Sequence, residues 1–131
     1  MDLSSEKTTH NFRVRAVSQY IPEQSDPHGK RYFFGYNIQI TNLGTKPAQL
    51  LARHWIITDG QGRTQEVKGE GVVGDQPLIP PGGSYQYSSF CPLETTTGTM
   101  EGTYQMVDPE TRKIFNIDIP RFFLVEPGSY N

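Results

Sequence analysis

Apolar and polar residues alternate with a period of two along much of this chain. That period is the pattern of β-strands with one buried face, because successive side chains of a strand point to opposite sides. We therefore predict strands over residues 12–20, 34–41 and 113–119. Their buried faces are predicted to carry Phe12, Val14 and Ala16 in the first strand, Phe34, Tyr36, Ile38 and Ile40 in the second, and Phe115, Ile117 and Ile119 in the third.

Four further strands are predicted from apolar runs between turn residues. Residues 50–58 are apolar on both parities, which indicates a central strand covered on both faces. The sequence Asp59-Gly60-Gln61-Gly62 is typical of a hairpin turn, here leading into a strand over 64–68. Segments 84–90 and 98–107 complete the set.

About seven short antiparallel strands without a convincing helix predict an all-β chain folded as an immunoglobulin-like β-sandwich. Trp55, on the central strand, fits the buried tryptophan of such folds, although the disulfide of true immunoglobulin domains is missing. The 131 residues suffice for one domain. We predict that this domain spans 12–125, between a flexible N-terminal tail over 1–11 and a C-terminal tail over 126–131.

Composition excludes some classes of partner. A formal net charge of −2 lacks the basic surplus of a nucleic-acid-binding protein, so no nucleic acid is expected. No apolar run is long enough to span a membrane, and residues 1–11 lack the apolar core of a signal peptide. The single cysteine, Cys91, cannot form an intramolecular disulfide. These observations predict a cytoplasmic protein with no membrane partner.

The residues that usually carry catalysis or bind metal are scattered. His10, His28 and His54 have no second ligand at a spacing typical of zinc sites. Cys91 precedes Pro92 at a strand end and is interpreted as a small buried apolar residue. We therefore predict a protein that is not an enzyme and has no catalytic residues, no metal site and no cofactor.

One string does match a ligand motif: Gly69, Gly71 and Gly74 form G-x-G-x-x-G. A dinucleotide-binding fingerprint needs a helix directly after it, because the helix N-terminus holds the pyrophosphate. Here three prolines and two glycines follow within residues 75–83, so no helix can form.

Two interpretations of this glycine loop (residues 69–74) remain open. Successive backbone amides can form a nest for a phosphate-containing ligand, attracted by Arg53, Arg63 and Lys68 but opposed by Glu70 and Asp75. Alternatively, the glycines only bend the chain. In that case Val72 and Val73, exposed at the loop tip, are predicted to belong to a surface for a protein partner.

Several blocks of the sequence resemble the ApaG (also called CorD) family of small bacterial proteins. The longest are Arg53-His54-Trp55-Ile56-Ile57-Thr58-Asp59 and the stretch 67–77 that holds the glycine loop. Shorter ones are Pro22-Glu23-Gln24-Ser25, Cys91-Pro92-Leu93, Thr97-Gly98-Thr99-Met100 and Gly102-Thr103-Tyr104-Gln105-Met106-Val107. The similarity extends from about residue 12 to residue 124 and its blocks make it specific.

The resemblance implies a fibronectin type III-like β-sandwich. It also implies a role in cobalt and magnesium resistance or efflux, without catalytic residues to transfer. Related domains in eukaryotic F-box proteins and in a polymerase-delta-interacting protein are similar to interaction modules, which implies one or more unknown protein partners. The family's glycine string is described as a pyrophosphate-binding motif, which corresponds to Gly69, Gly71 and Gly74 here. A protein-interaction module is the favoured function, and a nucleotide- or pyrophosphate-binding protein is the alternative.

Overall fold

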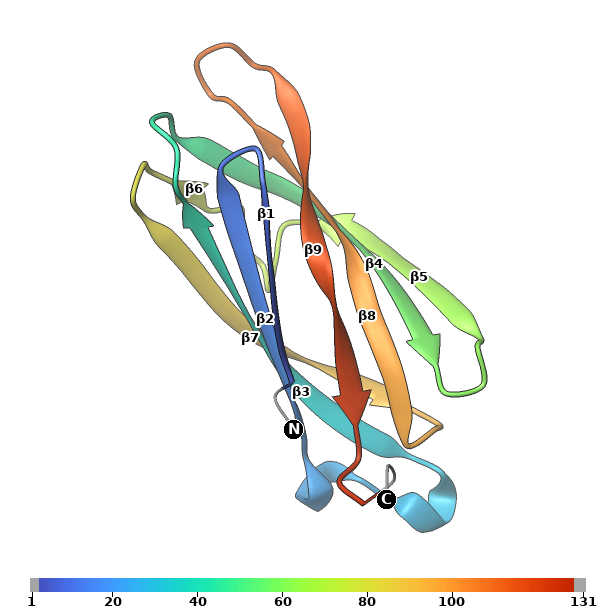
Figure 1. The fold of residues 1–131 in the computed structure, drawn as a ribbon. Helices are drawn as coiled ribbons and strands as arrows, with labels where there is room; N and C mark the ends of the chain where they lie inside the picture. The colour runs from blue at the N-terminus through green and yellow to red at the C-terminus, as the bar shows by residue number, and fades with distance from the viewer. Residues whose placement is uncertain (1–2, 129–131) are drawn as a thin grey trace.

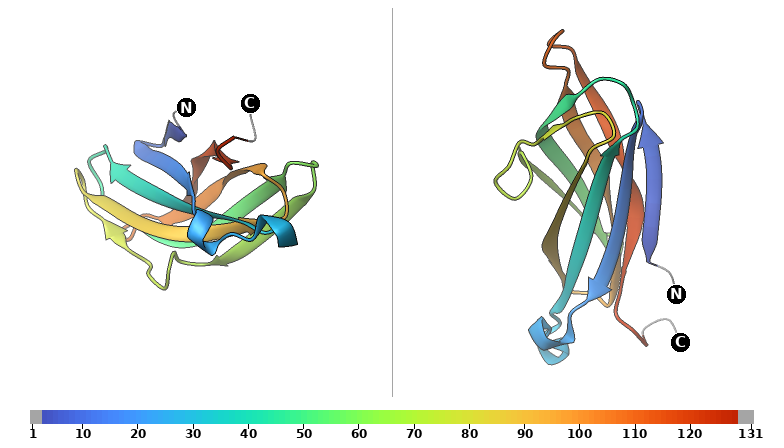
Figure 2. Two further views of the ribbon diagram at one scale, coloured as in Figure 1. Left: turned by 90° about the horizontal axis from the view of Figure 1, so that it is seen from below. Right: turned by 90° about the vertical axis from the view of Figure 1, so that its left-hand side faces the viewer.

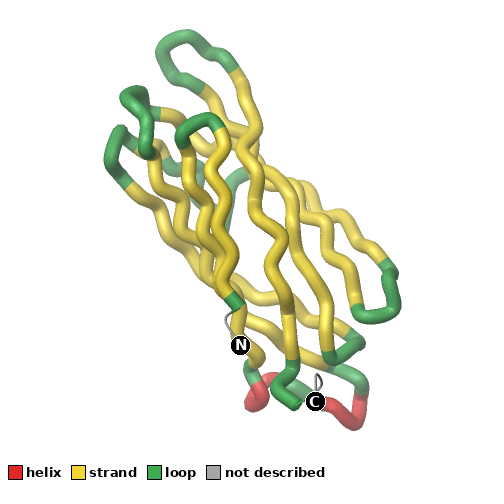
Figure 3. Tube along the Cα trace, in the orientation of Figure 1, coloured by secondary structure: helices red, strands yellow, loops and turns green. Residues whose placement is uncertain are grey.

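A computed structural model describes residues 3–128 as two antiparallel β-sheets packed face to face (Figure 1). The first sheet has the order β1-β2-β3-β7, and the second has the order β5-β4-β8-β9, with the short β6 also paired to β4. Two single-turn 3₁₀ helices at one end of the sandwich are the only helical segments within the described residues (Figure 3). The strands are β1 (Ser4–Thr9), β2 (Phe12–Tyr20), β3 (Tyr32–Asn42), β4 (Ala48–Asp59), β5 (Thr64–Glu70), β6 (Leu78–Ile79), β7 (Ser84–Leu93), β8 (Thr97–Val107) and β9 (Ile114–Val125), and the 3₁₀ turns are η1 (Pro22–Gln24) and η2 (Pro27–Gly29).

The predicted all-β sandwich is confirmed, and its core consists largely of the predicted residues. Trp55 is 3% exposed and packs against Tyr36, at 5.4 Å between ring centroids, and Phe122, at 5.9 Å. Phe115 is half-buried and packs on the edge of the core. The other residues predicted on the buried faces of strands 12–20, 34–41 and 113–119 are all buried: Phe12, Val14, Ala16, Phe34, Tyr36, Ile38, Ile40, Ile117 and Ile119.

The flexible N-terminal tail predicted over 1–11 is wrong for the part that is described. Residues Ser4–Thr9 form β1, which pairs with β2 through a tight turn at His10 and Asn11. Both turn residues have positive φ, 49° and 67°, as a two-residue hairpin requires. Lys7 adds an ion pair with Asp118 of β9 at 2.7 Å. Residues 1–2 lie outside the described part of the chain.

The last strand is longer than predicted, because β9 continues through Pro120 to Val125. The pairing of β9 with β8 shifts register within this continuation, where Pro120 and Arg121 of β9 lie opposite Glu101 alone. Of the predicted C-terminal tail, residues 126–128 lie outside any strand, and 129–131 lie outside the described residues.

A β-bulge explains why β4 has apolar residues at both odd and even positions. The strand is central, between β5 and β8, as predicted, but its outer face is only half-buried, so the prediction of two covered faces is wrong. The register shifts between Leu50 and Ala52, so Leu50 before the shift and Trp55 after it both face the core despite their opposite parity.

The two long edges of the sandwich differ. At one edge β9 packs against β1 and β2, and the two views of Figure 2 show β1 and β9 side by side. At the other edge the outermost strands are β7 in one sheet and β5 in the other. The glycine loop leaves β5 there, and Asp75, directly after the loop, accepts a hydrogen bond from the Tyr85 hydroxyl of β7 at 2.9 Å. This second edge is where the predicted site residues lie.

Candidate functional site

The glycine loop is a tight turn whose amides are largely used by the chain itself. Gly69 lies within β5, opposite Arg53, and no helix follows the loop, as predicted. The Gly71 amide donates to the Leu51 carbonyl at 2.8 Å. The Val72 and Asp75 amides donate to each other's carbonyls at 2.8 and 2.9 Å. A nest needs free, converging amides. Pyrophosphate binding at Gly69, Gly71 and Gly74 stays a prediction.

Arg53 is held against the loop rather than pointing towards a ligand. Its Nη1 donates to the carbonyls of Glu70 and Gly71, both at 3.0 Å. A side chain at Gly69 would collide with it, since a Cβ built there lies 2.9 Å from the guanidinium. Arg53 therefore closes the base of the loop, a role that sequence reasoning missed.

The predicted pair of exposed valines is half wrong. Val73, at the tip, is 57% exposed, whereas Val72 is fully buried and belongs to the core. Gly71 has φ of +65°, and this bend turns the next side chain inward. The loop tip thus offers one apolar side chain, not a surface.

Two buried tyrosines and the cysteine place titratable groups in the interior. The hydroxyls of Tyr87, on β7, and Tyr104, on β8, bond to each other across the core. Burial raises the pKa of both tyrosines and raises the pKa of the Cys91 thiol to about 11. These groups stay protonated at neutral pH, which makes the thiol a poor nucleophile.

The three histidines are far from forming a metal site. His10 packs edge-on against Phe115 at 5.7 Å, His28 lies in η2, and His54 Nε2 bonds Glu66 Oε1 at 2.8 Å. Within residues 3–128, no three His, Cys, Asp or Glu side chains lie close enough to hold one ion.

An exposed apolar cluster does occur on the outer face of the first sheet. Phe90 of β7 is 59% exposed and stacks on Phe33 of β3, with 5.3 Å between ring centroids. Gly35 lies between Ile21 and Phe90, and a Cβ built on it would lie 3.0 Å from the Ile21 side chain. Val17, 36% exposed, lines the same shallow hollow of about 250 Å³ as Phe90. We call Val17, Ile21, Phe33 and Phe90 the outer aromatic patch; sequence alternation gives no sign of it.

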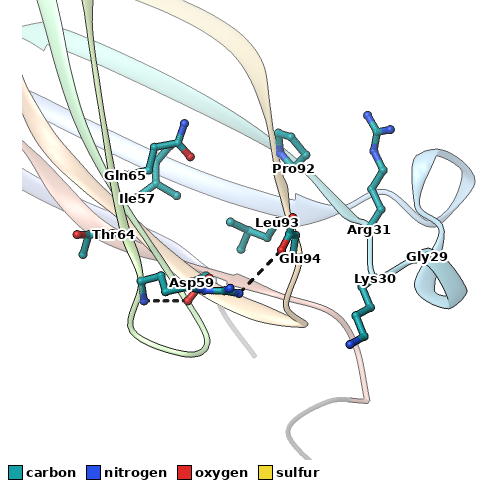
Figure 4. Close-up of a pocket in the computed structure, with 11 residues that line it drawn as sticks. Gly29, Lys30, Arg31, Ile57, Asp59, Thr64, Gln65, Pro92, Leu93 and Glu94 are labelled. Atoms are coloured by element: carbon teal, nitrogen blue, oxygen red, sulfur yellow. Dashed lines mark hydrogen bonds and ion pairs between the residues drawn. The ribbon is translucent and has the colours of Figure 1, made fainter.

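A larger hollow of about 580 Å³ lies where β7 ends, beside η2 and the β4–β5 hairpin (Figure 4). Arg63 Nε bonds Asp59 at 2.7 Å, and its Nη2 lies 4.0 Å from Glu94. Lys30 and Arg31 extend from the η2 side in different directions. We call this hollow the terminal pocket; Ile57, Pro92 and Leu93 supply its apolar lining.

Comparison with known proteins identifies relatives along almost the entire chain. The family model described as the ApaG domain matches residues 22–108. Protein ApaG of Dechloromonas aromatica is 53% identical over 123 residues, which are 94% of this chain and 96% of the relative. Protein ApaG of Pseudomonas aeruginosa is 52% identical over 122 residues, 93% of this chain and 96% of the relative.

Solved structures agree with the computed one. The crystal structure of a Bordetella pertussis protein described as ApaA superposes with a TM-score of 0.87 at 48% identity, covering 93% of this chain and 98% of that one. The C-terminal domain of wzt, only 7% identical, shares the fold alone, with a TM-score of 0.56. No helix among the described residues is long and apolar enough to cross a membrane.

Proposed function

Because this chain belongs to the ApaG family, we propose that it is a non-catalytic protein-interaction module with an indirect link to cobalt and magnesium resistance. The observation that carries the proposal is the outer aromatic patch. Phe90, on the edge strand β7, exposes more than half of its surface and stacks on Phe33 of the neighbouring strand. Contiguous exposed apolar groups of this kind mark surfaces that bind other proteins.

The polar groups of the interior support a binding role rather than catalysis. The thiol and the two bonded tyrosine hydroxyls are buried with raised pKa values, and His54 is engaged with Glu66. A nucleophile needs an adjacent base and access to substrate. The described part of the chain brings no such pair together in a pocket.

The indirect link to divalent cations follows from the same distribution of ligands. His54 and Glu66 form a half-exposed pair, and no third ligand lies beside them among residues 3–128. Two donors at a surface hold Co²⁺ weakly, because tight sites use three or more. Calorimetric titration of the purified chain with Co²⁺ should therefore show no tight stoichiometric site. One tight site that is lost in His54→Ala would contradict the indirect link.

The interaction role is tested by capture and complementation with matched variants. Phe90→Ser removes the centre of the patch, and Phe123→Ser removes a side chain of similar exposure, 53%, from the other sheet. We expect a specific cytosolic protein to be recovered on the immobilised wild-type chain and on Phe123→Ser, but not on Phe90→Ser. The same pattern is expected for cobalt tolerance of a bacterial strain lacking its own ApaG protein. Equal recovery and equal tolerance with both variants would refute the patch as the binding surface.

A further inference from the structure

Strand β7 is an edge strand without the features that usually protect edges. Its ten residues, Ser84–Leu93, contain no charged side chain, and its only proline is Pro92, next to its end. Proteins commonly guard such edges with charges, proline or a covering element, because an edge offers unpaired backbone groups to any passing strand.

The other three outer strands have these protections. The seven residues of β5 include Glu66, Lys68 and Glu70. In β1, Lys7 pairs with Asp118 of β9, so these two edges cover each other. Only β7, among the long strands that end a sheet in the described chain, is both uncharged and open.

The ladder with β3 determines which backbone groups of β7 are free. The Asn42 amide donates to the Gly83 carbonyl on the β7 side of β3. On the β2 side, the Ile21 amide donates to the Phe33 carbonyl. In the middle strand of an antiparallel sheet, successive residues direct their backbone N–H and C=O groups alternately towards the two neighbouring strands. The backbone groups of even-numbered β3 residues therefore point towards β7, and those of odd-numbered β3 residues point towards β2. The β7 residues that pair with these even-numbered β3 residues are odd-numbered. The even-numbered β7 residues before Pro92 therefore direct their amide and carbonyl groups away from the sheet: Ser84, Gln86, Ser88 and Phe90.

Side chains on the outer face hold this edge in place. Asn37 Nδ2 donates to Ser88 Oγ at 2.9 Å and to the Tyr87 carbonyl at 3.1 Å. Gln86 Nε2 in turn donates to Asn37 Oδ1 at 3.0 Å. Asn37 thus holds Gln86 and Ser88, two of the outward-facing residues of β7, in place. This order lowers the entropy lost when another strand binds.

The terminal pocket adds charge at the Leu93 end of the edge. Arg63 is neutralised there by Asp59 and Glu94. Lys30 and Arg31 line the same pocket, and no ion pair involving either is seen within residues 3–128. A carboxylate near these two cations would meet a favourable field.

We infer that β7 is a strand-addition site that takes an extended segment of a partner protein, uncharged except for an acidic side chain at the end next to Lys30 and Arg31. This inference rests on the proposed interaction role and assigns its binding mode. Main-chain hydrogen bonds to Gln86, Ser88 and their neighbours supply affinity, and side-chain contacts supply specificity. The outer aromatic patch lies beside the added strand, because Phe90 belongs to β7.

The test uses the full chain and a phage library of random twelve-residue peptides. Selected peptides are synthesised, and their binding is measured by fluorescence polarisation and by amide exchange in NMR spectra. Ser88→Pro removes an outward amide, a change that an edge strand tolerates because the β3 ladder keeps its bonds. Ser88→Ala is the matched control, since it removes the hydroxyl that bonds Asn37 but keeps the amide. Unfolding curves confirm that both variants fold.

The inference expects selected peptides rich in Val, Ile and Thr with an acidic end. Ser88→Pro should weaken them about tenfold or more, Ser88→Ala should change binding about twofold at most, and Lys30→Glu should weaken the acidic peptides. Binding should slow amide exchange at Gln86, Ser88 and Phe90.

Other outcomes overturn the inference. Peptides that bind Ser88→Pro normally but not Phe90→Ser would refute strand addition and leave the interaction role standing. A dimer of this chain that dissociates on Ser88→Pro would mean that a second copy occupies the edge instead. Failure to select any peptide would refute the site, and together with no Phe90-dependent protein capture it would refute both proposals.

Discussion

Replacing Tyr104 by phenylalanine should destabilise the fold although it removes a single oxygen atom. Tyr104 is fully buried and Tyr87 is 7% exposed, and their hydroxyls bond to each other between the two sheets. The substitution leaves the Tyr87 hydroxyl in the core without this partner. An unsatisfied buried polar group costs about 1–3 kcal/mol, so we expect a loss of about 2 kcal/mol in the free energy of unfolding.

The double variant distinguishes the cost of an orphaned hydroxyl from the cost of a changed shape. Tyr87→Phe should also cost about 2 kcal/mol, whereas both changes together should cost about 1 kcal/mol or less, because no buried hydroxyl is then left alone. The expected deviation from additivity is therefore about 3 kcal/mol, at the upper end for residues in contact.

Urea unfolding followed by tryptophan fluorescence measures these energies directly. Trp55 is the only tryptophan, is buried, and lies 6.4 Å from the Tyr104 ring. Tyr85→Phe is the matched control, since its hydroxyl bonds Asp75 at the surface and its loss should cost less than about 1 kcal/mol. Additive effects of the two core substitutions, or a cost below about 0.5 kcal/mol for Tyr104→Phe, would refute the reasoning.

Three further predictions concern the open edge of the sandwich. Gly71→Val should prevent folding or lower the free energy of unfolding by more than about 3 kcal/mol, because a Cβ there would lie 2.3 Å from the Asp75 carbonyl oxygen. Gly74→Ala, where the added Cβ meets open space, should cost about 1 kcal/mol, and chemical denaturation compares the two variants. Burial raises the pKa of Cys91 from 9.0 to about 11, so the unfolded thiol ionises first, and Cys91 should lower stability by about 1 kcal/mol per pH unit between pH 9 and 10, beside the contribution of the buried tyrosines; a slope unchanged in Cys91→Ala would contradict this. Pyrophosphate at millimolar concentration should leave the melting temperature unchanged, because the Gly71, Val72 and Asp75 amides are already bonded; a salt-sensitive rise that is lost in Lys68→Ala would show that the loop binds anions.

The alternating segments predicted most of the fold because one face of each strand is buried, and burial selects apolar residues there. β1 escaped prediction because its sequence, Ser-Ser-Glu-Lys-Thr-Thr, has no apolar face; pairing with β2 and the turn at His10 and Asn11 define it instead. The bulge in β4 escaped for a different reason. A shift of register leaves no mark in the sequence beyond apolar residues on both parities, which is also the mark of a strand covered on both faces.

The surfaces proposed for binding could not be predicted from residue patterns alone. The absence of charge over 84–93 is visible in the sequence, but it has meaning only if the strand lies at an edge, and strand order is a property of the whole topology. Likewise Phe33 and Phe90 are 57 positions apart (90 minus 33), and only the pairing of β3 with β7 brings them together. Long-range register thus decides which unremarkable residues become a surface.

The glycine string shows the converse, since a recognisable motif can be explained without a ligand. Gly69 leaves room for the Arg53 guanidinium, Gly71 provides a positive φ beside the Asp75 carbonyl, and Gly74 provides another positive φ directly after that of Val73. These are three separate steric requirements of one tight connection between β5 and β6. Loss of stability at any of them is therefore not evidence for pyrophosphate, and only a ligand-dependent, salt-sensitive effect on the folded chain can separate a binding loop from a turn.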